Sequence, residues 1–297
     1  MQYESLAPDL RAWLKDNIDR GFARESLEQS LRAAGYQPKF AREAIELAFE
    51  REGQRAPQPV PAPSPAAVAA GDQPLSSSEI IAATDNVLDA GDRRVSILFA
   101  LNAPRIVLFG GLLSDDECEQ MIAQSRVKLQ RSTVVNAATG DYDVHPDRTS
   151  SGTHFQRGEN ELVRRIEQRI AALIGAPVEN GEPIQVLHYT PGAEYKPHFD
   201  FFDPSYEGND KVLAMGGQRV ATLVMYLNDV DAGGSTVFPE VGLDVLPRRG
   251  NAVFFAYATD DGQLDRRTLH GGSPVARGEK WIATKWLRQH AYTGPSA

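Results

Sequence analysis

The stretch QVLHYTPGAEYKPHFDFF, residues 185–202, decides how the rest of the chain is interpreted. Its residues His198 and Asp200 are two positions apart, so alternation along an extended strand places both side chains on one face. An imidazole and a carboxylate from one strand can supply two ligands to a divalent metal. His270, in the later segment Thr-Leu-His-Gly-Gly, is the leading candidate for a third ligand. Two histidines and one carboxylate leave three octahedral positions open, the arrangement of non-haem Fe(II) oxygenases.

A second group of residues follows this predicted metal site at a specific spacing. Lys280 comes ten residues after His270 and is followed by Trp281. The order His198-x-Asp200, His270, Lys280-Trp281 resembles the catalytic domain of the 2-oxoglutarate- and Fe(II)-dependent prolyl 4-hydroxylases. The resemblance covers residues 95–292. Supporting matches are Tyr189, RTSSG at 148–152, RVATLVMYLND at 219–229 and GGSTVFPE at 233–240.

The resemblance implies a site for the cosubstrate next to the metal. It assigns His198, Asp200 and His270 to Fe(II), and it pairs Lys280 with the far carboxylate of 2-oxoglutarate. Such a pairing is physically reasonable because a buried carboxylate without a charge partner is costly. Two hydroxyl donors are implied as well: Tyr189 and Tyr226. The cofactors implied are therefore Fe(II), 2-oxoglutarate and O2, with ascorbate as a candidate reductant.

The resemblance also implies a groove for a proline-containing peptide or protein. Trp286 suits proline because a flat aromatic ring matches a compact apolar ring that has no backbone N–H. Where the family often has histidine two residues after this tryptophan, the chain has Arg288, so the details of peptide contact depart from the family pattern. The residues implied to line the groove are Arg148, Ser150, Glu182, Arg219 and Trp286.

Composition narrows the class of protein. With 297 residues and 41% hydrophobic residues, the chain has the length and composition for a sizeable core. The net charge of -9 argues against a nucleic-acid partner, because such binding depends on many Lys and Arg contacts to phosphates. The single cysteine, Cys118, allows no intramolecular disulfide and fits a reducing compartment. No run of about 18 apolar residues predicts a membrane span, and cytoplasmic residence is the expectation.

The chain divides into three parts by composition. Residues 1–52 have apolar residues at helical spacing, broken at Gly21-Phe22 and Gly35-Tyr36, which predicts a small all-α bundle with a protein-interaction role. Residues 53–77 are rich in Pro and Ala and predict an extended linker. Residues 78–297 form the predicted dioxygenase domain.

The dioxygenase domain is predicted to be an all-β jelly roll, a double-stranded β-helix, with supporting α-helices. Ser114-Asp-Asp-Glu117 is a capping box that opens a helix, and residues 161–174 form an amphipathic helix that ends at Gly175. Beyond Glu182, short apolar or alternating runs are separated by Gly, Asp and Pro, as in antiparallel barrels. The expected strands are 184–189, 220–227, 235–238, 252–257 and 281–287.

Two polar segments are candidates for mobile lids over the site. Residues 203–217 directly follow the metal strand, and residues 136–152 precede the helix at 161–174. Loops of this kind often cover active sites, although plain surface loops share the same composition.

Three functional hypotheses remain open from the sequence. The first is a dioxygenase that hydroxylates proline in a peptide or protein, with succinate and CO2 as coproducts. The second retains this oxygenase chemistry but acts on a free amino acid, another side chain or an alkylated nucleobase. The third is an inactive binding module that is recruited through the N-terminal bundle.

Overall fold

The computed structural model describes most of the C-terminal three quarters of the chain and part of the N-terminal quarter. The described residues are scattered positions between 3 and 31, together with 36–52, 85–131, 134–135, 142–143, 148–258 and 263–294. Contacts divide the chain into two compact units, Met1–Ala70 and Gly71–Ala297. The predicted linker at 53–77 lies outside the described residues.

The N-terminal unit contains the helix α3 (Pro38–Glu52). The apolar side of α3 belongs to a buried cluster that also includes Leu14 and Leu27 from earlier segments. Those earlier segments are described only at scattered positions, so the all-α bundle of residues 1–52 stays a prediction.

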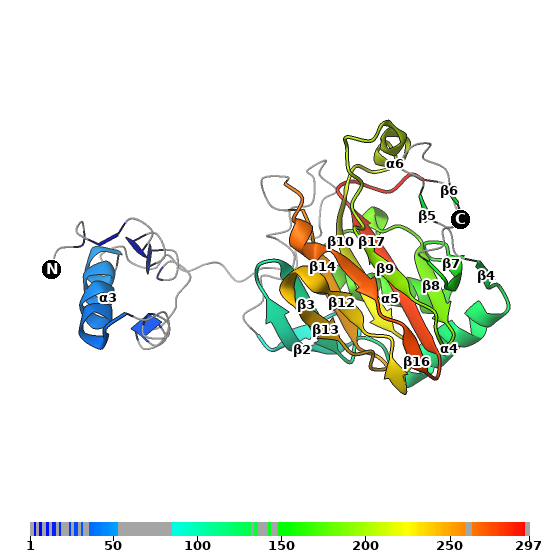
Figure 1. Cartoon of the computed structure of the whole chain (residues 1–297), viewed down its shortest axis with the longest axis horizontal. Helices are drawn as coiled ribbons and strands as arrows, with labels where there is room; N and C mark the ends of the chain where they lie inside the picture. The colour runs from blue at the N-terminus through cyan, green and yellow to red at the C-terminus, as the bar shows by residue number, and fades with distance from the viewer. Residues whose placement is uncertain are drawn as a thin grey trace. The chain divides into compact units, whose positions relative to one another are not determined.

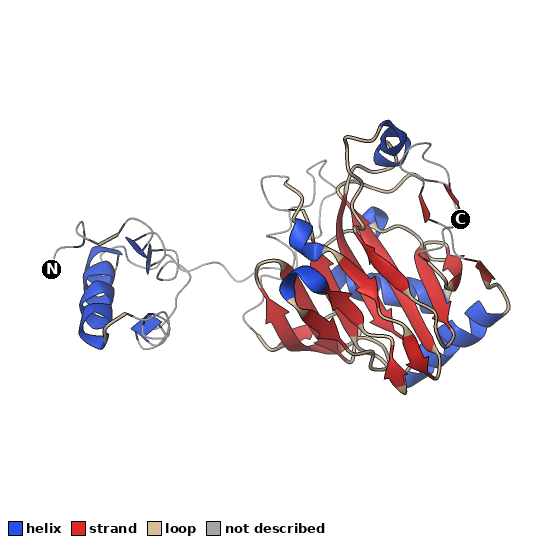
Figure 2. Ribbon diagram, in the orientation of Figure 1, coloured by secondary structure: helices blue, strands red, loops and turns tan. Residues whose placement is uncertain are grey.

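The C-terminal unit is mostly β-sheet with few helices, as a jelly roll requires (Figures 1 and 2). All strand pairs described are antiparallel. In spatial order, the larger sheet has the strands β1 (Val87–Asp89), β2 (Arg94–Leu101), β3 (Arg105–Gly110), β14 (Ala252–Ala256), β10 (Arg219–Tyr226), β17 (Lys280–Arg288), β8 (Ile184–Tyr189), β7 (Ser151–Phe155) and β4 (Gln130–Arg131).

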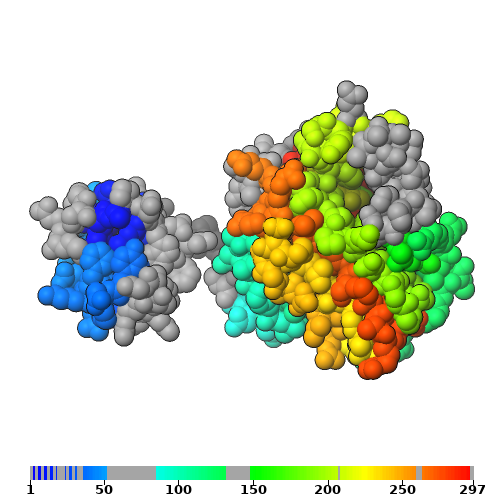
Figure 3. Space-filling model, viewed as in Figure 1, coloured from blue at the N-terminus to red at the C-terminus, as the bar shows by residue number. Residues whose placement is uncertain are grey.

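A smaller sheet faces this one. Its spatial order is β13 (Leu243–Val245), β12 (Thr236–Phe238), β15 (His270–Gly272) and β9 (Tyr195–His198). The surface of the β12–β13 hairpin, yellow to orange, is turned toward the viewer in Figure 3. Two further strand pairs are β5 (Val134–Val135) with β6 (Tyr142–Asp143), and β11 (Ala232–Gly233) with β16 (Val275–Arg277).

The helices formed where the sequence predicts them. Ser114 accepts from the backbone of Glu117 and closes the predicted capping box at the start of α4 (Asp115–Arg126). The helix α5 (Glu161–Ile174) ends at Gly175, which adopts the left-handed conformation that favours glycine. The remaining short elements are α6 (Asp210–Leu213) and the 3-10 turns Val178–Asn180, Glu207–Asn209, Pro239–Val241 and Arg266–Thr268.

Alternation along the strands divides the interior into two cores. On β10, Leu223 and Met225 belong to the core that includes the apolar faces of α4 and α5. Val224 and Tyr226, on the opposite face, belong to the core shared with the smaller sheet. The two sheets and the helices are therefore stacked in layers, and side chains of the second face lead into the space between the sheets. Among the described residues, no helix has the length and apolar character needed to cross a membrane.

Candidate active site

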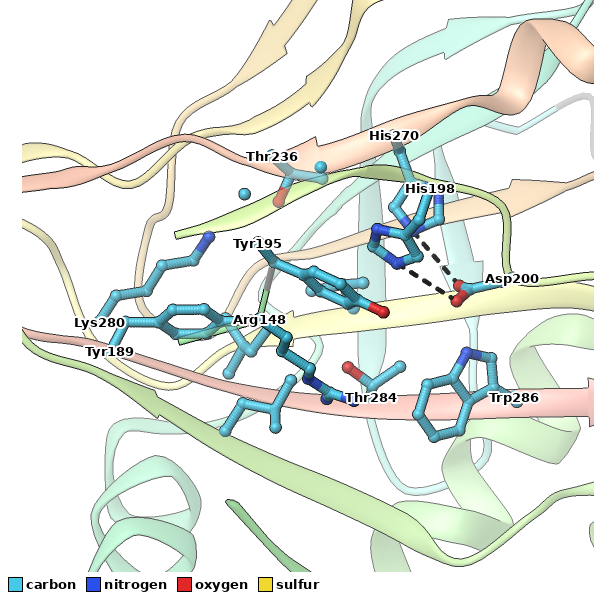
Figure 4. Close-up of a pocket in the computed structure, with 15 residues that line it drawn as sticks. Arg148, Tyr189, Tyr195, His198, Asp200, Thr236, His270, Lys280, Thr284 and Trp286 are labelled. Carbon is cyan, nitrogen blue, oxygen red and sulfur yellow. Dashed lines mark ion pairs between the residues drawn. The ribbon is translucent and has the colours of Figure 1, made fainter. Parts of the chain in front are cut away.

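The three predicted metal ligands meet between the two sheets. His198 at the end of β9 is the register partner of His270 on β15, and Asp200 follows two residues later. The carboxylate oxygens of Asp200 lie 3.6 Å from His198 Nε2 and 3.4 Å from His270 Nε2 (Figure 4). One ligand atom from each residue falls within 4.8 Å of the others. This spacing lets one divalent ion contact all three.

Backbone and side-chain contacts hold these groups in a metal-binding form. The Nδ1 atoms of His198 and His270 lie 2.9 Å from Lys196 O and 3.1 Å from Thr268 O. Because a carbonyl only accepts, each Nδ1 carries the proton and each Nε2 keeps its lone pair for a metal. Thr222, on β10, donates to Asp200 Oδ2 at 2.7 Å and fixes the carboxylate.

Electrostatics favour an ionised Asp200 carboxylate beside a neutral His198 imidazole. Burial by itself raises the pKa of Asp200, but the adjacent His270 and His198 outweigh it and hold that pKa well below its usual value. Burial, followed by the proximity of His270, lowers the pKa of His198. Asp200 therefore enters the site as an anion and His198 as a neutral base, the protonation states that bind metal.

The cluster opens into a pocket with about 430 Å³ of empty space, part of it open to solvent, and Lys280 lines the same pocket. Figure 4 shows Lys280 and Tyr189 at the end of this pocket away from His198, Asp200 and His270. Lys280 is only 2% exposed, and burial lowers its pKa to about 8. Its ammonium has no hydrogen bond or ion pair to any residue in the described parts of the chain. A buried cation in this state fits an anionic ligand such as a carboxylate.

The two tyrosines predicted to bind the cosubstrate differ in position. Tyr189 lines the pocket, with its ring 5.4 Å from Lys280 Nζ. Tyr226 is not among the lining residues and donates to Thr236 Oγ1 at 2.8 Å. Because Thr236 accepts this bond and lines the pocket, its own hydroxyl proton is free to point inward. Tyr226 thus acts on the pocket through Thr236.

The five predicted groove residues fall into two groups. Arg148 and Trp286 line the pocket. Ser150 is fully buried and bonds to Tyr189. Glu182 and Arg219 do not line the pocket either. They form an ion pair with each other, and the Arg219 guanidinium packs on the Trp286 ring. The lid candidate at 136–152 lies largely outside the described residues.

The sequence analysis missed several pocket residues. Tyr195 stacks on His198 with ring centroids 3.7 Å apart, and the Arg148 guanidinium lies 4.9 Å from the centre of the Tyr195 ring. The signal for Tyr195 was its place three residues before His198 in the decisive stretch. Ile282 and Thr284 also line the pocket, and alternation from Lys280 to Trp286 along β17 predicts both.

Known proteins are similar to this chain over the region that contains the site. Residues 184–288 match the model of the 2OG-Fe(II) oxygenase superfamily. The chain is 41% identical over 208 residues to prolyl 4-hydroxylase 5 of Arabidopsis thaliana, which covers 64% of this chain and 70% of that protein. It is 45% identical over 205 residues to prolyl 4-hydroxylase 1 of the same plant, with coverage of 64% and 70%. Among solved structures, the 2OG complex of the viral collagen prolyl hydroxylase vCPH from Paramecium Bursaria Chlorella virus-1 matches with a TM-score of 0.49 and 30% identity, over 62% of this chain and 95% of that one.

Proposed function

The chain belongs to the prolyl 4-hydroxylase family of the 2OG-Fe(II) oxygenase superfamily, and we propose that the pocket between its two sheets is where this dioxygenase hydroxylates proline in a peptide or protein. Fe(II), 2-oxoglutarate and O2 are the requirements of this family, and succinate and CO2 are the coproducts. One observation carries the assignment to this pocket. A His-Asp-His cluster and a buried ammonium with no counter-charge among the described residues line the same cavity.

We assign iron binding to His198, Asp200 and His270. Their donor set, two imidazoles and one carboxylate, is the one that leaves positions open on a non-haem iron. When bound, Fe(II) supplies the oxygen chemistry that converts 2-oxoglutarate to succinate and CO2 and places one oxygen atom on the substrate carbon. The chain itself contributes ligand geometry: Thr222 holds the Asp200 carboxylate, and two backbone carbonyls set the orientation of the imidazoles.

Lys280 binds the far carboxylate of 2-oxoglutarate in this proposal. The ammonium has no hydrogen-bond or ion-pair partner among the described residues. A bound carboxylate would therefore gain a counter-charge and would offset the cost of burying the cation. The hydroxyls of Tyr189 and Thr236 are placed to add hydrogen bonds, since both residues line the pocket. The apolar side chains of Leu187, Val224 and Ile282 exclude water around the cosubstrate.

Proline docks on the other side of the pocket, against Trp286. The half-buried indole offers a flat apolar face, and the Arg219 guanidinium lies 4.1 Å from its ring centre. Arg148, whose guanidinium donates to Gln185 Oε1 at 2.6 Å, also lines the pocket. These positions supply the orientation that brings a proline ring to the metal cluster.

The direct test is Fe(II)-dependent conversion of 2-oxoglutarate to succinate, with and without proline-containing peptides, for the wild type and His198→Ala. We expect peptide-stimulated turnover and a mass gain of one oxygen on proline, both lost in the variant. Turnover that no proline peptide stimulates would move the substrate to another class. Failure of the wild type to bind iron would overturn the assignment of the three ligands.

We further propose that the N-terminal unit recruits the protein substrate. Deleting residues 1–70, the limits of that unit, is expected to leave turnover of a short peptide unchanged and to reduce turnover of the whole protein target. Equal turnover of both substrates by both forms would refute recruitment. Ascorbate as the reductant stays a prediction, and the dependence of repeated turnover on added ascorbate tests it. Residence in the cytoplasm also stays a prediction, and cell fractionation tests it.

A further inference from the structure

Arg288, the residue that departs from the family pattern, does not line the pocket. It ends β17 on the same face as Lys280 and Trp286, but it is 2% exposed and is not a lining residue. Its guanidinium donates from Nε to Glu182 Oε1 at 2.6 Å. Its Nη1 donates to Gly217 O at 2.6 Å and to Val212 O at 3.1 Å. Arg288 therefore joins the strand to the loop that follows the metal ligands.

Glu182 links Arg288 to a second arginine. Arg219 donates from Nε to Glu182 Oε1 at 2.7 Å and from Nη2 to Oε2 at 2.9 Å. Arg219 and Arg288 are register partners on β10 and β17, and two like charges in that position repel each other. The carboxylate between them offsets this repulsion. Burial opposes its ionisation, but Arg219 and then Arg288 outweigh burial and lower the pKa of Glu182.

Arg219 carries this anchoring to the reaction site. Its guanidinium lies over the Trp286 ring, and its Nη1 donates to Asp200 O at 3.2 Å. The ring of Phe202 lies against both guanidiniums, 4.7 Å from that of Arg219 and 4.9 Å from that of Arg288. One ion cluster therefore touches the proposed proline platform and the backbone of a metal ligand at once.

The loop at 203–217 is fixed at its base by the same region. Gln218 donates from Nε2 to Phe202 O at 2.6 Å and accepts from Phe202 N at 2.8 Å through Oε1, which closes the two ends of the loop. Gly217 has φ of +74°, and a Cβ there would meet Gln289 Oε1 at 2.8 Å, so the tail after β17 packs tightly against the loop. These contacts favour a preformed wall over the mobile lid expected from the sequence.

We propose that Arg288 is a positioning residue for the peptide substrate. Through Glu182 it holds Arg219 against Trp286, and through Val212 O and Gly217 O it holds the base of the 203–217 loop, so that the Trp286 side of the groove is formed before the peptide binds. A preformed surface spares the peptide the cost of ordering these side chains. Arginine suits this role because its planar fork donates in several directions at once, which a lysine ammonium at the end of a flexible stem cannot reproduce. The inference rests on the proposed function and adds to it the residue that prepares the substrate side.

The test compares Arg288→Gln and Arg288→Lys with the wild type, all full length. Arg288→Gln leaves Glu182 paired with Arg219, so the fold is expected to persist. We expect the KM for a proline peptide to rise about tenfold, with kcat and the KM for 2-oxoglutarate changed less than twofold. The peptide KM of Arg288→Lys is expected to lie between that of the wild type and that of Arg288→Gln. Hydrogen exchange of the metal-free protein, which does not depend on activity, is expected to be faster at the backbone amides of residues 210–217 in Arg288→Gln.

Two controls separate positioning from general destabilisation. Lys285→Gln removes another buried ion pair on the same strand, with Glu167 at 2.6 Å on the opposite face, and is expected to lower Tm without changing the peptide KM. Gln218→Ala opens the loop closure and removes the hydrogen bond from the Arg219 backbone N–H to Gln218 Oε1, but it leaves the ion pairs of Glu182 in place. It is expected to change the peptide KM and the loop exchange in the same direction as Arg288→Gln. A folded Arg288→Gln with an unchanged peptide KM, or with both KM values raised equally, would overturn the proposal. A wild type that hydroxylates no proline peptide would instead contradict the proposed function, and the exchange data would still report on the loop.

Discussion

Replacing Lys280 with methionine should stabilise the free protein while it abolishes tight cosubstrate binding. Methionine matches the length and apolar stem of lysine but has no charge. In the free protein, Lys280 is buried with no hydrogen bond or ion pair from the described residues, so its charge is a cost that only the cosubstrate relieves. Lys280→Met removes both the cost and the binding partner.

The size of the effect follows from the pKa of Lys280. Burial lowers that pKa from 10.5 to about 8, which corresponds to about 3 kcal/mol against the charged form in the folded state. We therefore expect Lys280→Met to raise the free energy of unfolding of the metal-free protein by up to about 3 kcal/mol at pH 7. A carboxylate that meets no ammonium loses its partner, so the affinity for 2-oxoglutarate should fall about a hundredfold or more.

The stability difference should also depend on pH in a defined direction. Below pH 8, Lys280 is charged in both folded and unfolded states, and the folded state bears the full cost. Between pH 8 and 10.5 the unfolded state binds the additional proton, so wild-type stability rises with pH and the advantage of the variant shrinks. At pH 9.5 the difference should be about 1.4 kcal/mol.

Urea unfolding at pH 7 and pH 9.5 measures the stabilities, and calorimetric titration of the iron-loaded protein with 2-oxoglutarate measures the affinity. The matched control is Lys285→Met, five residues along the same strand, where Glu167 accepts from the buried ammonium at 2.6 Å. That variant leaves a buried carboxylate without its ion-pair partner and should lose about 3–5 kcal/mol. If Lys280→Met proved less stable than the wild type, or bound 2-oxoglutarate equally well, the reasoning about Lys280 would be refuted.

Three further outcomes are expected. Thr222→Val removes the hydrogen bond to Asp200 and should weaken iron binding about 10- to 100-fold in a metal titration. The control is Thr284→Val, because Thr284 lines the pocket but has no hydrogen bond to a proposed metal ligand. Equal iron affinities of the two variants would contradict a role for Thr222. The KM for 2-oxoglutarate should be constant below pH 8 and should rise about tenfold per pH unit above it, because Lys280 loses its proton. Lys280→Arg should remove this rise in KM. A rise that persists in that variant would assign the titration to another group. Ser114→Ala breaks the capping box of α4 and should cost about 1 kcal/mol of stability without affecting turnover, as urea unfolding and succinate formation measure; a loss of turnover at full stability would show that α4 contributes to the site.

Local patterns predicted much of the fold. The strand expected at 184–189 has the same bounds as β8, and the helix expected at 161–174 has the same bounds as α5. Both segments carry their own signal: short alternation in the first, helical spacing with a terminal glycine in the second. The pairing of β9 with β15, which brings His270 opposite His198, joins residues 72 positions apart. The sequence predicted that the two histidines share a metal, but not that their segments pair as strands.

Glu182 shows what sequence reasoning leaves undecided. Family resemblance placed its side chain in the peptide groove, whereas the structure places its carboxylate between Arg219 and Arg288. These partners are 37 and 106 positions away along the chain. The sequence does not distinguish a carboxylate that contacts a ligand from one that pairs with a buried arginine, because the role depends on the charges that surround the carboxylate after folding.

The sequence by itself determined the ligand types, the strand and helix patterns and the position of each lysine on β17. Alternation puts Lys280 and Lys285 on opposite faces of that strand, but it does not say what each face meets. The tertiary structure decided that one face packs on α5, where Glu167 pairs with Lys285, and that the other opens into the pocket, where Lys280 remains available for a ligand. Two buried lysines five residues apart thus have opposite roles, because pairing of buried charges is settled by contacts between distant segments.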